Sequence, residues 1–176
     1  MAKVELLSPI IEKWEGGYQC YPQDTGNKNS KGELVGTNKG ITPATYERAF
    51  GKCPTVDDMK SIALDQFNTV LKKFYWDHWK ADQINNQSVA NLLVDWCYCS
   101  GSHGIKLPQE ILGVTTDGIV GDKTITSLNS QNQSQFFQKV WDRRLKFLND
   151  IVKNNPNQSK FIKGWVNRLE SFKYSE

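Results

Sequence analysis

The stretch Val89-Ala90-Asn91-Leu92-Leu93-Val94-Asp95-Trp96-Cys97 is apolar on most sides when it is wound as a helix. A helix with that property is normally the buried, central helix of a domain. We therefore expect a helix over residues 86–100 at the centre of the fold, with the other helices packed around it.

Outward from this stretch, apolar residues recur every three or four positions along most of the chain, which predicts amphipathic helices. The segment before Gly16-Gly17 is expected to begin near Ser8, because Pro9 favours a late start. Residues 18–42 are instead rich in Gly, Asn, Lys, Thr and Ser, which favours a short irregular β-hairpin with a long loop. The predicted fold class is therefore mainly α, with one small β-hairpin near the N-terminus. The further helices are expected at 42–50, 55–75, 106–112, 122–129, 134–153 and 158–173.

The composition excludes several classes of protein. Hydrophobic residues make up 38% and charged residues 23% of the 176 residues, which suits a globular domain and not a disordered chain. The net charge is only +3, and no run of Lys and Arg is longer than Arg143-Arg144, so nucleic-acid binding is not expected. No stretch is apolar enough for a membrane span or a signal peptide. The two His and four Cys show no metal-binding pattern, so we expect reduced thiols and neither a metal nor a cofactor.

Glu15 is the candidate for catalysis, in the stretch Trp14-Glu15-Gly16-Gly17-Tyr18. The two glycines let the backbone turn sharply and leave room for a substrate beside the carboxyl group. The flanking aromatic rings reduce its hydration and so favour the protonated acid that cleavage of a glycosidic bond requires. Because the dipole of a helix disfavours an anion at the C-terminal end, a purely structural reason for glutamate at this place is weak.

A second carboxylate is expected across the sugar from Glu15. Asp24 follows inside the predicted hairpin, and a hairpin that folds back beside the helix end would bring it opposite Glu15. Glu33 lies in the same insert and is the rival candidate. Thr37 or Asn38 could hold an attacking water molecule, although both are also ordinary turn residues.

These residues carry a resemblance to a known family. Glu15-Gly16-Gly17-Tyr18 and Asp24, followed by the segment 37–42, are similar to the signature of glycoside hydrolase family 108. Members of that family are phage-lysozyme-like N-acetylmuramidases, some of which are called secretion activators. Four further motifs extend the resemblance over nearly the whole chain: Phe74-Tyr75-Trp76-Asp77, Val89-Ala90 with Asp95, Thr116-Asp117-Gly118-Ile119-Val120-Gly121, and Phe161-Ile162-Lys163-Gly164-Trp165-Val166-Asn167-Arg168.

The resemblance implies roles for particular residues. Glu15 would be the catalytic acid, Asp24 the second carboxylate and Thr37 the hydroxyl that positions water. The residues expected to bind substrate are Tyr18, Asn38 and Asp95. This chain departs from the family pattern in the long insert of residues 24–32 and in Lys39, which replaces a tyrosine, so Asp24 and Glu33 both remain candidates.

The resemblance also implies a lysozyme-like α+β fold and a function. Residues 1–100 would form the catalytic region, and residues 101–176 a peptidoglycan-binding-like helical region packed into the same compact unit. The expected reaction is hydrolysis of the β-1,4 bond between N-acetylmuramic acid and N-acetylglucosamine by a monomer. The alternatives are a lytic transglycosylase acting on the same bond and a non-catalytic wall-binding or secretion-accessory protein. Without a signal peptide, the protein is expected to be made in the cytoplasm and to reach the cell wall by export or lysis.

Overall fold

The computed structural model describes all 176 residues, and its contacts divide the chain into two compact units. The N-terminal unit is Val4–Tyr75, and the C-terminal unit is Trp76–Glu176 together with Met1–Lys3. The contacts change over between Tyr75 and Trp76, because the helix at residues 87–100 packs against helices that follow it in the chain. The expected division into residues 1–100 and 101–176 stays a prediction.

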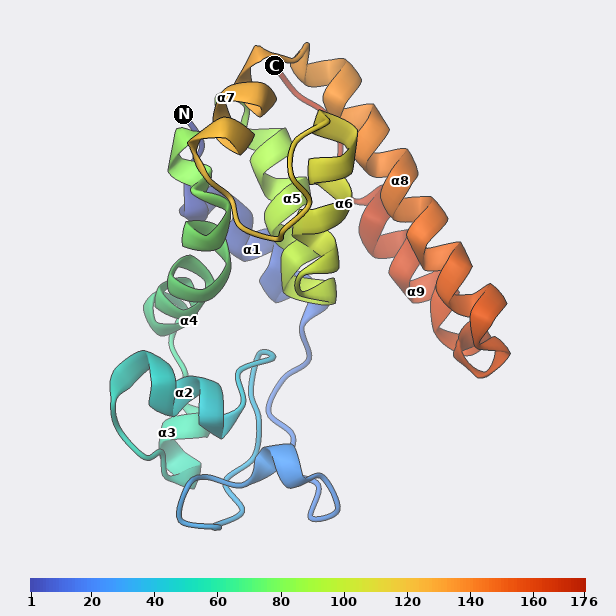
Figure 1. Cartoon of the computed structure of the whole chain (residues 1–176). Coiled ribbons are helices and arrows are strands. Elements are labelled where there is room, and N and C mark those ends of the chain that lie inside the picture. The colour runs from blue at the N-terminus through green and yellow to red at the C-terminus, as the bar shows by residue number, and fades with distance from the viewer. The chain divides into compact units, whose positions relative to one another are not determined.

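The N-terminal unit is built from short helices around a long irregular segment (Figure 1). Helix α4 is its packing partner for both α1 and α2. Its helices are α1 (Val4–Trp14), α2 (Pro43–Phe50), α3 (Val56–Lys60) and α4 (Leu64–Leu71), and a π-helical turn (Lys72–Trp76) follows.

Helix α1 begins before the expected start at Ser8 and carries Pro9 in its interior. Proline has no N–H to donate, so the helix loses one internal hydrogen bond there. The buried apolar face formed by Val4, Leu7 and Ile11 compensates for that loss. The helix ends directly before Glu15 and the two glycines, as predicted.

The single helix expected over residues 55–75 is interrupted. It begins as predicted at Thr55, whose hydroxyl accepts from the N–H of Asp58 while the Asp58 carboxylate accepts from the N–H of Thr55. After one short helix, the hydroxyl of Ser61 donates to the carbonyl of Asp57 at 2.6 Å and closes the turn. A second start follows, where Gln66 accepts from the N–H of Ala63 at 3.0 Å. These side-chain bonds replace the backbone bonds of a continuous helix.

The predicted β-hairpin is wrong, because residues 15–42 contain only isolated bridges, such as Gln19 with Thr37, and a 3₁₀ turn at Thr25–Asn27. Repeated turns prevent strands from extending: Gly32 and Gly36 have φ angles of 79° and 83°. Side-chain amides provide much of the hydrogen bonding that a strand ladder would otherwise supply.

The C-terminal unit is helical, and α5 lies at its centre as the sequence predicted. Helix α5 packs against α6 and α8, and α8 runs alongside α9 (Figure 1). Its residues Leu92, Leu93, Val94 and Trp96 are fully buried. No helix of the chain has the length and apolar character to cross a membrane. The longer helices are α5 (Gln87–Ser100), α6 (His103–Leu112), α7 (Asp122–Ser130), α8 (Gln133–Asn154) and α9 (Ser159–Glu170).

The contact between α5 and α6 is close enough to require glycine. A β-carbon on Gly104 of α6 would lie 2.3 Å from the backbone nitrogen of Cys97 on α5. The backbones of the two helices therefore touch at this point, which fixes α6 on the central helix.

Candidate active site

Glu15 follows the last residue of α1 and is half-buried. Its backbone N–H donates to the carbonyl of Ile11 at 3.1 Å, so the last turn of the helix holds its position. Gly16 and Gly17 are exposed, and a β-carbon on either would meet no atom within 4 Å. The structure thus leaves open space beside Glu15, which is the property that the two glycines predicted.

Two ties hold the backbone on either side of Glu15. Before it, Glu12 on α1 forms an ion pair with Lys39, with 2.5 Å between Oε1 and Nζ. After it, Gln19 and Thr37 exchange two backbone hydrogen bonds of 2.8 Å each. Glu15 therefore lies between two residues, Glu12 and Gln19, that both bond to the segment 37–39. We call residues 12–19 the arc around Glu15. Lys39, the residue that departs from the family pattern, makes one of these ties.

The loop that carries Thr37 is organised around Asn27, which is fully buried. Its side-chain oxygen accepts from the Thr37 hydroxyl at 2.7 Å and from the Gln19 amide at 3.1 Å. Its side-chain nitrogen donates to Gln19 Oε1 and to the carbonyl of Tyr21, both at 3.1 Å. The amide thus uses both of its protons and both of its acceptor sites. Sequence reasoning did not single out Asn27, because one asparagine in a polar loop carries no local signal.

The hydrogen bond from Thr37 to Asn27 determines whether the threonine hydroxyl can act as a donor or as an acceptor toward other molecules. A hydroxyl group has one proton and two acceptor sites. The Thr37 hydroxyl donates a hydrogen bond to Asn27, so its oxygen can accept a hydrogen bond from a further group. Thr37 is half-buried, and its oxygen is therefore suited to accepting a hydrogen bond from water.

The two candidate carboxylates, Asp24 and Glu33, are both exposed but lie in different parts of the loop. Asp24 accepts from the N–H of Gly26 at 2.9 Å, and its carbonyl accepts from the N–H of Asn27, so it belongs to the Asn27 network. Glu33 accepts from the side chain of Asn29 at 2.8 Å, and Asn29 also donates to the carbonyl of Pro54. Glu33 therefore closes a separate turn, and Asp24 is the candidate that shares the hydrogen-bond network of Thr37.

Tyr18 packs across the loop. Its hydroxyl donates to the carbonyl of Val35 at 3.1 Å, and Lys60 Nζ lies 5.4 Å from the ring centre. A β-carbon on Gly36 would lie 2.6 Å from the ring, so this glycine is needed for close approach as well as for its positive φ. Desolvation raises the pKa of Tyr18, and Cys20 adds to the increase.

Asn38 is buried and holds the loop on α3. Its side chain donates to the carbonyls of Met59 at 2.8 Å and Lys60 at 3.2 Å, at the C-terminal end of that helix. The predicted role of Asn38 in binding substrate therefore gains no support from its surroundings, since both amide protons are directed into the protein.

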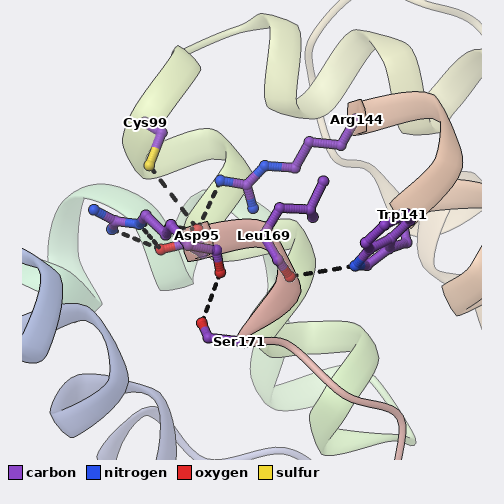
Figure 2. Close-up of polar contacts among 7 residues, drawn as sticks. Asp95, Cys99, Trp141, Arg144, Leu169 and Ser171 are labelled. Atoms are coloured by element: carbon purple, nitrogen blue, oxygen red, sulfur yellow. Dashed lines mark hydrogen bonds and ion pairs between the residues drawn. The ribbon is translucent and has the colours of Figure 1, made fainter. Parts of the chain in front are cut away.

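Asp95 belongs to the C-terminal unit, and the structure encloses it (Figure 2). Its side chain is fully buried and accepts from Arg144 Nη2 on α8 at 2.8 Å. Arg168 of α9 donates from Nη2 at 2.7 Å and from Nε at 3.1 Å. The thiol of Cys99 approaches the same carboxylate, with 3.9 Å between sulfur and oxygen. The geometry makes Asp95 the centre of a buried ion-pair cluster that joins α5, α8 and α9, and its predicted contact with substrate stays a prediction.

The segment 116–121 forms a tight turn. Gly118 has a φ of 80° and donates its N–H to Gln109 Oε1 at 2.9 Å. Asp117 accepts from the N–H of Ile119 at 2.8 Å, and this bond is the main cause of its lowered pKa. The turn is thus accounted for by the buried side chain of Gln109.

The structure contains no cluster of side chains arranged to bind a metal ion and no disulfide bond. No group of three or more His, Cys, Asp and Glu side chains is arranged to hold a metal ion. No disulfide joins the four cysteines, and Cys97 alone is buried, which raises its pKa to about 11.

Residues 9–101, just over half of the chain, match the family described as Glycosyl hydrolase 108. The chain belongs to this glycosyl hydrolase family. Residues 103–170 match a second family, described as Predicted Peptidoglycan domain. Together the two matches confirm the resemblance drawn from the sequence motifs, and they identify a glycosyl hydrolase that acts on peptidoglycan.

A solved structure supports the same relationship over the full length. The chain is similar to the structure described as that of Brucella abortus SagA, with 26% sequence identity and a TM-score of 0.73. The similarity covers 96% of this chain and 90% of the other. A search of curated proteins gave no match.

The ion pairs of Asp95 link the two matched regions of this glycosyl hydrolase. Asp95 lies in the glycosyl hydrolase 108 match, whereas Arg144 and Arg168 lie in the peptidoglycan-domain match. The sequence motifs included Asp95 and Arg168 but gave no sign that they pair, and Arg144 was missed altogether. The one available signal was an acidic residue in an otherwise apolar helix, because a buried charge requires a partner.

Proposed function

We propose that this glycosyl hydrolase cleaves the β-1,4 bond between N-acetylmuramic acid and N-acetylglucosamine, with Glu15 as the general acid. The observation that carries the proposal is the arc around Glu15: a half-buried carboxyl group, open space at Gly16-Gly17, and ties that fasten it to the segment containing Thr37. An acid beside an open approach, in a segment bonded to the one that carries a fixed hydroxyl, suits the hydrolysis of a glycoside.

In the proposed reaction, the protonated Glu15 donates its proton to the oxygen of the leaving sugar. The bond from that oxygen to the anomeric carbon of N-acetylmuramic acid breaks, and positive charge develops on the sugar ring. Water held by the Thr37 hydroxyl attacks the anomeric carbon. Asp24 stabilises the developing charge and accepts the proton that the water loses. Support for this pairing comes from Asn27, whose side chain accepts from the Thr37 hydroxyl and whose backbone N–H donates to the backbone carbonyl of Asp24.

Glu15→Gln tests the proposal, because glutamine keeps the shape of the side chain but has no proton of the required acidity. Clearing of purified peptidoglycan sacculi is expected to slow by about 10²–10⁴-fold while the circular-dichroism spectrum stays unchanged. Glu5→Gln is the matched control, since Glu5 is an exposed glutamate in the first turn of the same helix. Full activity of a folded Glu15→Gln protein would exclude Glu15 as the acid.

The products distinguish the proposed reaction from its alternatives. Hydrolysis leaves a reducing N-acetylmuramic acid end, which borohydride converts into the sugar alcohol before mass spectrometry. A lytic transglycosylase would leave 1,6-anhydro ends, which are lighter by one water molecule and resist reduction. A non-catalytic wall-binding protein would sediment with sacculi and release no fragments.

A further inference from the structure

An open groove in the C-terminal unit lies between the first half of α8 and the C-terminal segment 172–174. Its volume is about 480 Å³, which is in the range of clefts that bind small molecules. One wall is a stripe of α8 residues at helical spacing, namely Ser134, Gln135, Phe137, Gln138 and Trp141. The other wall consists of Phe172, Lys173 and Tyr174. The peptidoglycan-domain match ends at residue 170, so the second wall is supplied by the part of the chain that follows the match.

Both walls of the groove are fixed by hydrogen bonds within the protein. The Trp141 indole N–H donates to the carbonyl of Leu169 at 3.2 Å, which holds the ring in place (Figure 2). Just beyond the groove, the carbonyl of Ser175 accepts from the Asn86 side chain at 2.8 Å. The N–H of Ser175 donates to Ser88 Oγ at 3.0 Å, so the C-terminal segment is tied to the start of α5. Walls that are already ordered bind a ligand without the entropy cost of ordering them.

Aromatic rings form the apolar part of the groove. Phe137 and Phe172 are buried, whereas Trp141 and Tyr174 are half-buried and keep accessible ring surface. The ring centres of Phe137 and Tyr174 lie 5.7 Å apart, so the two walls touch. Half-exposed Trp and Tyr rings combine an apolar face with a polar tip. They therefore suit the C–H face of a sugar ring, whose edge carries hydroxyl groups.

Polar side chains on both walls supply hydrogen-bonding groups. Gln138 Nε2 donates to Asp142 Oδ1 at 2.8 Å, which orients the amide and leaves its oxygen available to accept from a ligand. Gln135 and Lys173 are exposed beside the rings. Lys173 is the only charged residue of the lining, and no carboxylate lines the groove. The lining thus disfavours a cationic ligand and offers donors and acceptors to a neutral polar one.

We propose that this groove binds one N-acetylhexosamine unit of a glycan strand. Since a cavity of about 150 Å³ admits benzene, a groove of this volume accommodates roughly 19 heavy atoms, which is enough for one such unit. The apolar face of the sugar would lie on Trp141 and Tyr174, and its acetamide group would bond to the side-chain amides. A sugar of the wall is favoured over other neutral ligands because the α8 wall belongs to the peptidoglycan-domain match. The site holds a sugar without cleaving it, so it goes beyond the proposed role of Glu15 and does not depend on it.

Binding of N,N′-diacetylchitobiose to the full-length Glu15→Gln protein tests the proposal, because this variant is not expected to consume the sugar. The Trp141 indole N–H signal, assigned in nuclear magnetic resonance spectra with Trp141→Phe, is expected to shift and to saturate. Cellobiose is the matched probe, since it has the same β-1,4 linkage but hydroxyl groups in place of the acetamides. It is expected to bind at least about tenfold more weakly because hydrogen bonds are lost. No shift with the chitobiose would overturn the proposal, and equal binding of cellobiose would overturn the assignment to an N-acetylated sugar.

Two variants place the binding in this groove. Tyr174→Ser removes a ring from one wall, and Gln138→Leu removes an amide from the other at similar volume. Each is expected to weaken binding of the chitobiose about two- to tenfold. Gln138 is exposed, so Gln138→Leu keeps the test valid if Tyr174→Ser does not fold. Lys139→Gln is the matched control, since Lys139 is exposed next to Gln138 on α8 but does not line the groove.

Unchanged affinity in a folded Gln138→Leu protein, or an equal loss in Lys139→Gln, would overturn the groove as the site. Hydrolysis is followed by wall clearing and groove binding by the Trp141 signal. Failure of the sugar site and failure of the proposed hydrolysis are therefore observed separately.

Discussion

The segment 15–42 and helix α5 each place one polar residue completely out of contact with solvent, but they stabilise it in different ways. In the loop, Asn27 is neutral and is held by side-chain and backbone hydrogen bonds of neighbouring turns. In the helix, Asp95 is charged and is held by two arginines that lie far along the chain. The loop is therefore organised by local hydrogen bonds around an open approach, whereas the helix is locked by ion pairs within a continuous apolar core.

The difference indicates where the molecule tolerates change. A neutral buried amide costs less to disturb than a buried charge, because an unpaired charge in an apolar interior has a much larger desolvation penalty. We expect perturbation of the loop to act locally and to appear mainly in activity. Perturbation of α5 should lower the stability of the whole C-terminal unit.

The largest effect is expected for Asp95→Asn, which removes the charged carboxylate that pairs with the buried Arg144 and with Arg168. Breaking a buried pair of this kind costs about 3–5 kcal/mol in the free energy of unfolding, measured by urea denaturation. Asp150→Asn is the matched control, since Asp150 forms an exposed pair with Lys146 one turn away on α8 and its loss is expected to change the stability little. An equal decrease in the free energy of unfolding for the two variants would show that the buried ion pairs of α5 contribute no more than a surface ion pair.

Gly104→Ala tests the packing of α6 on α5. The added methyl group would lie 2.3 Å from the Cys97 nitrogen, so the helices must separate, at a cost of about 1–3 kcal/mol or more. Gly164→Ala on α9 is the control, because its methyl group would meet no atom within 4 Å and alanine favours the helix by about 0.5–1 kcal/mol. Thermal unfolding of both variants measures the contrast, and a stable Gly104→Ala protein would contradict the close contact.

Asn27→Ala tests whether the hydrogen bonds of Asn27 hold the segment 15–42 together. It leaves the Thr37 hydroxyl and the Gln19 amide without their partner, which is expected to cost about 1–3 kcal/mol. Amide exchange measured by mass spectrometry should rise in residues 15–42 and stay unchanged in α5, and wall clearing should fall. Asn157→Ala, at an exposed asparagine, serves as the control. Faster exchange across α5 as well would show that the loop is not an independent element.

The smallest effect concerns pH and the start of α3. The hydrogen bond from Lys52, with further bonds from Thr55, lowers the pKa of Asp58 from 3.8 to about 2. A lowered pKa in the folded protein contributes stability above pH 3.8 that is lost as the pH falls through about 2. Wild type is therefore expected to exceed Asp58→Ala in stability by under about 1 kcal/mol at pH 6, because the pair with Lys52 is at the surface. The charge-dependent part of this difference should disappear below about pH 2, and a pH-independent difference would contradict the assignment.

Most of the helices, and the place of Glu15, could be predicted from the sequence because the deciding signals are local. Thr42 and Thr55 cap α2 and α3 at the expected starts of helices near residues 42 and 55, and α1 ends directly before Glu15. The β-hairpin was predicted wrongly because turn-rich composition does not reveal whether two segments pair as strands or are held by side-chain amides. Asn27 escaped prediction for the same reason.

By itself, the sequence determined the buried central helix, the place of Glu15 at the end of the first helix and the membership in a glycosyl hydrolase family. Each of these depends on the period of apolar residues or on motifs a few residues long. Only the tertiary structure decided that Asp95 pairs with Arg144 and Arg168, which follow it by 49 and 73 positions. The physical reason is that a charge can be buried by any arginine that the fold brings within reach, and sequence spacing does not limit which one that is.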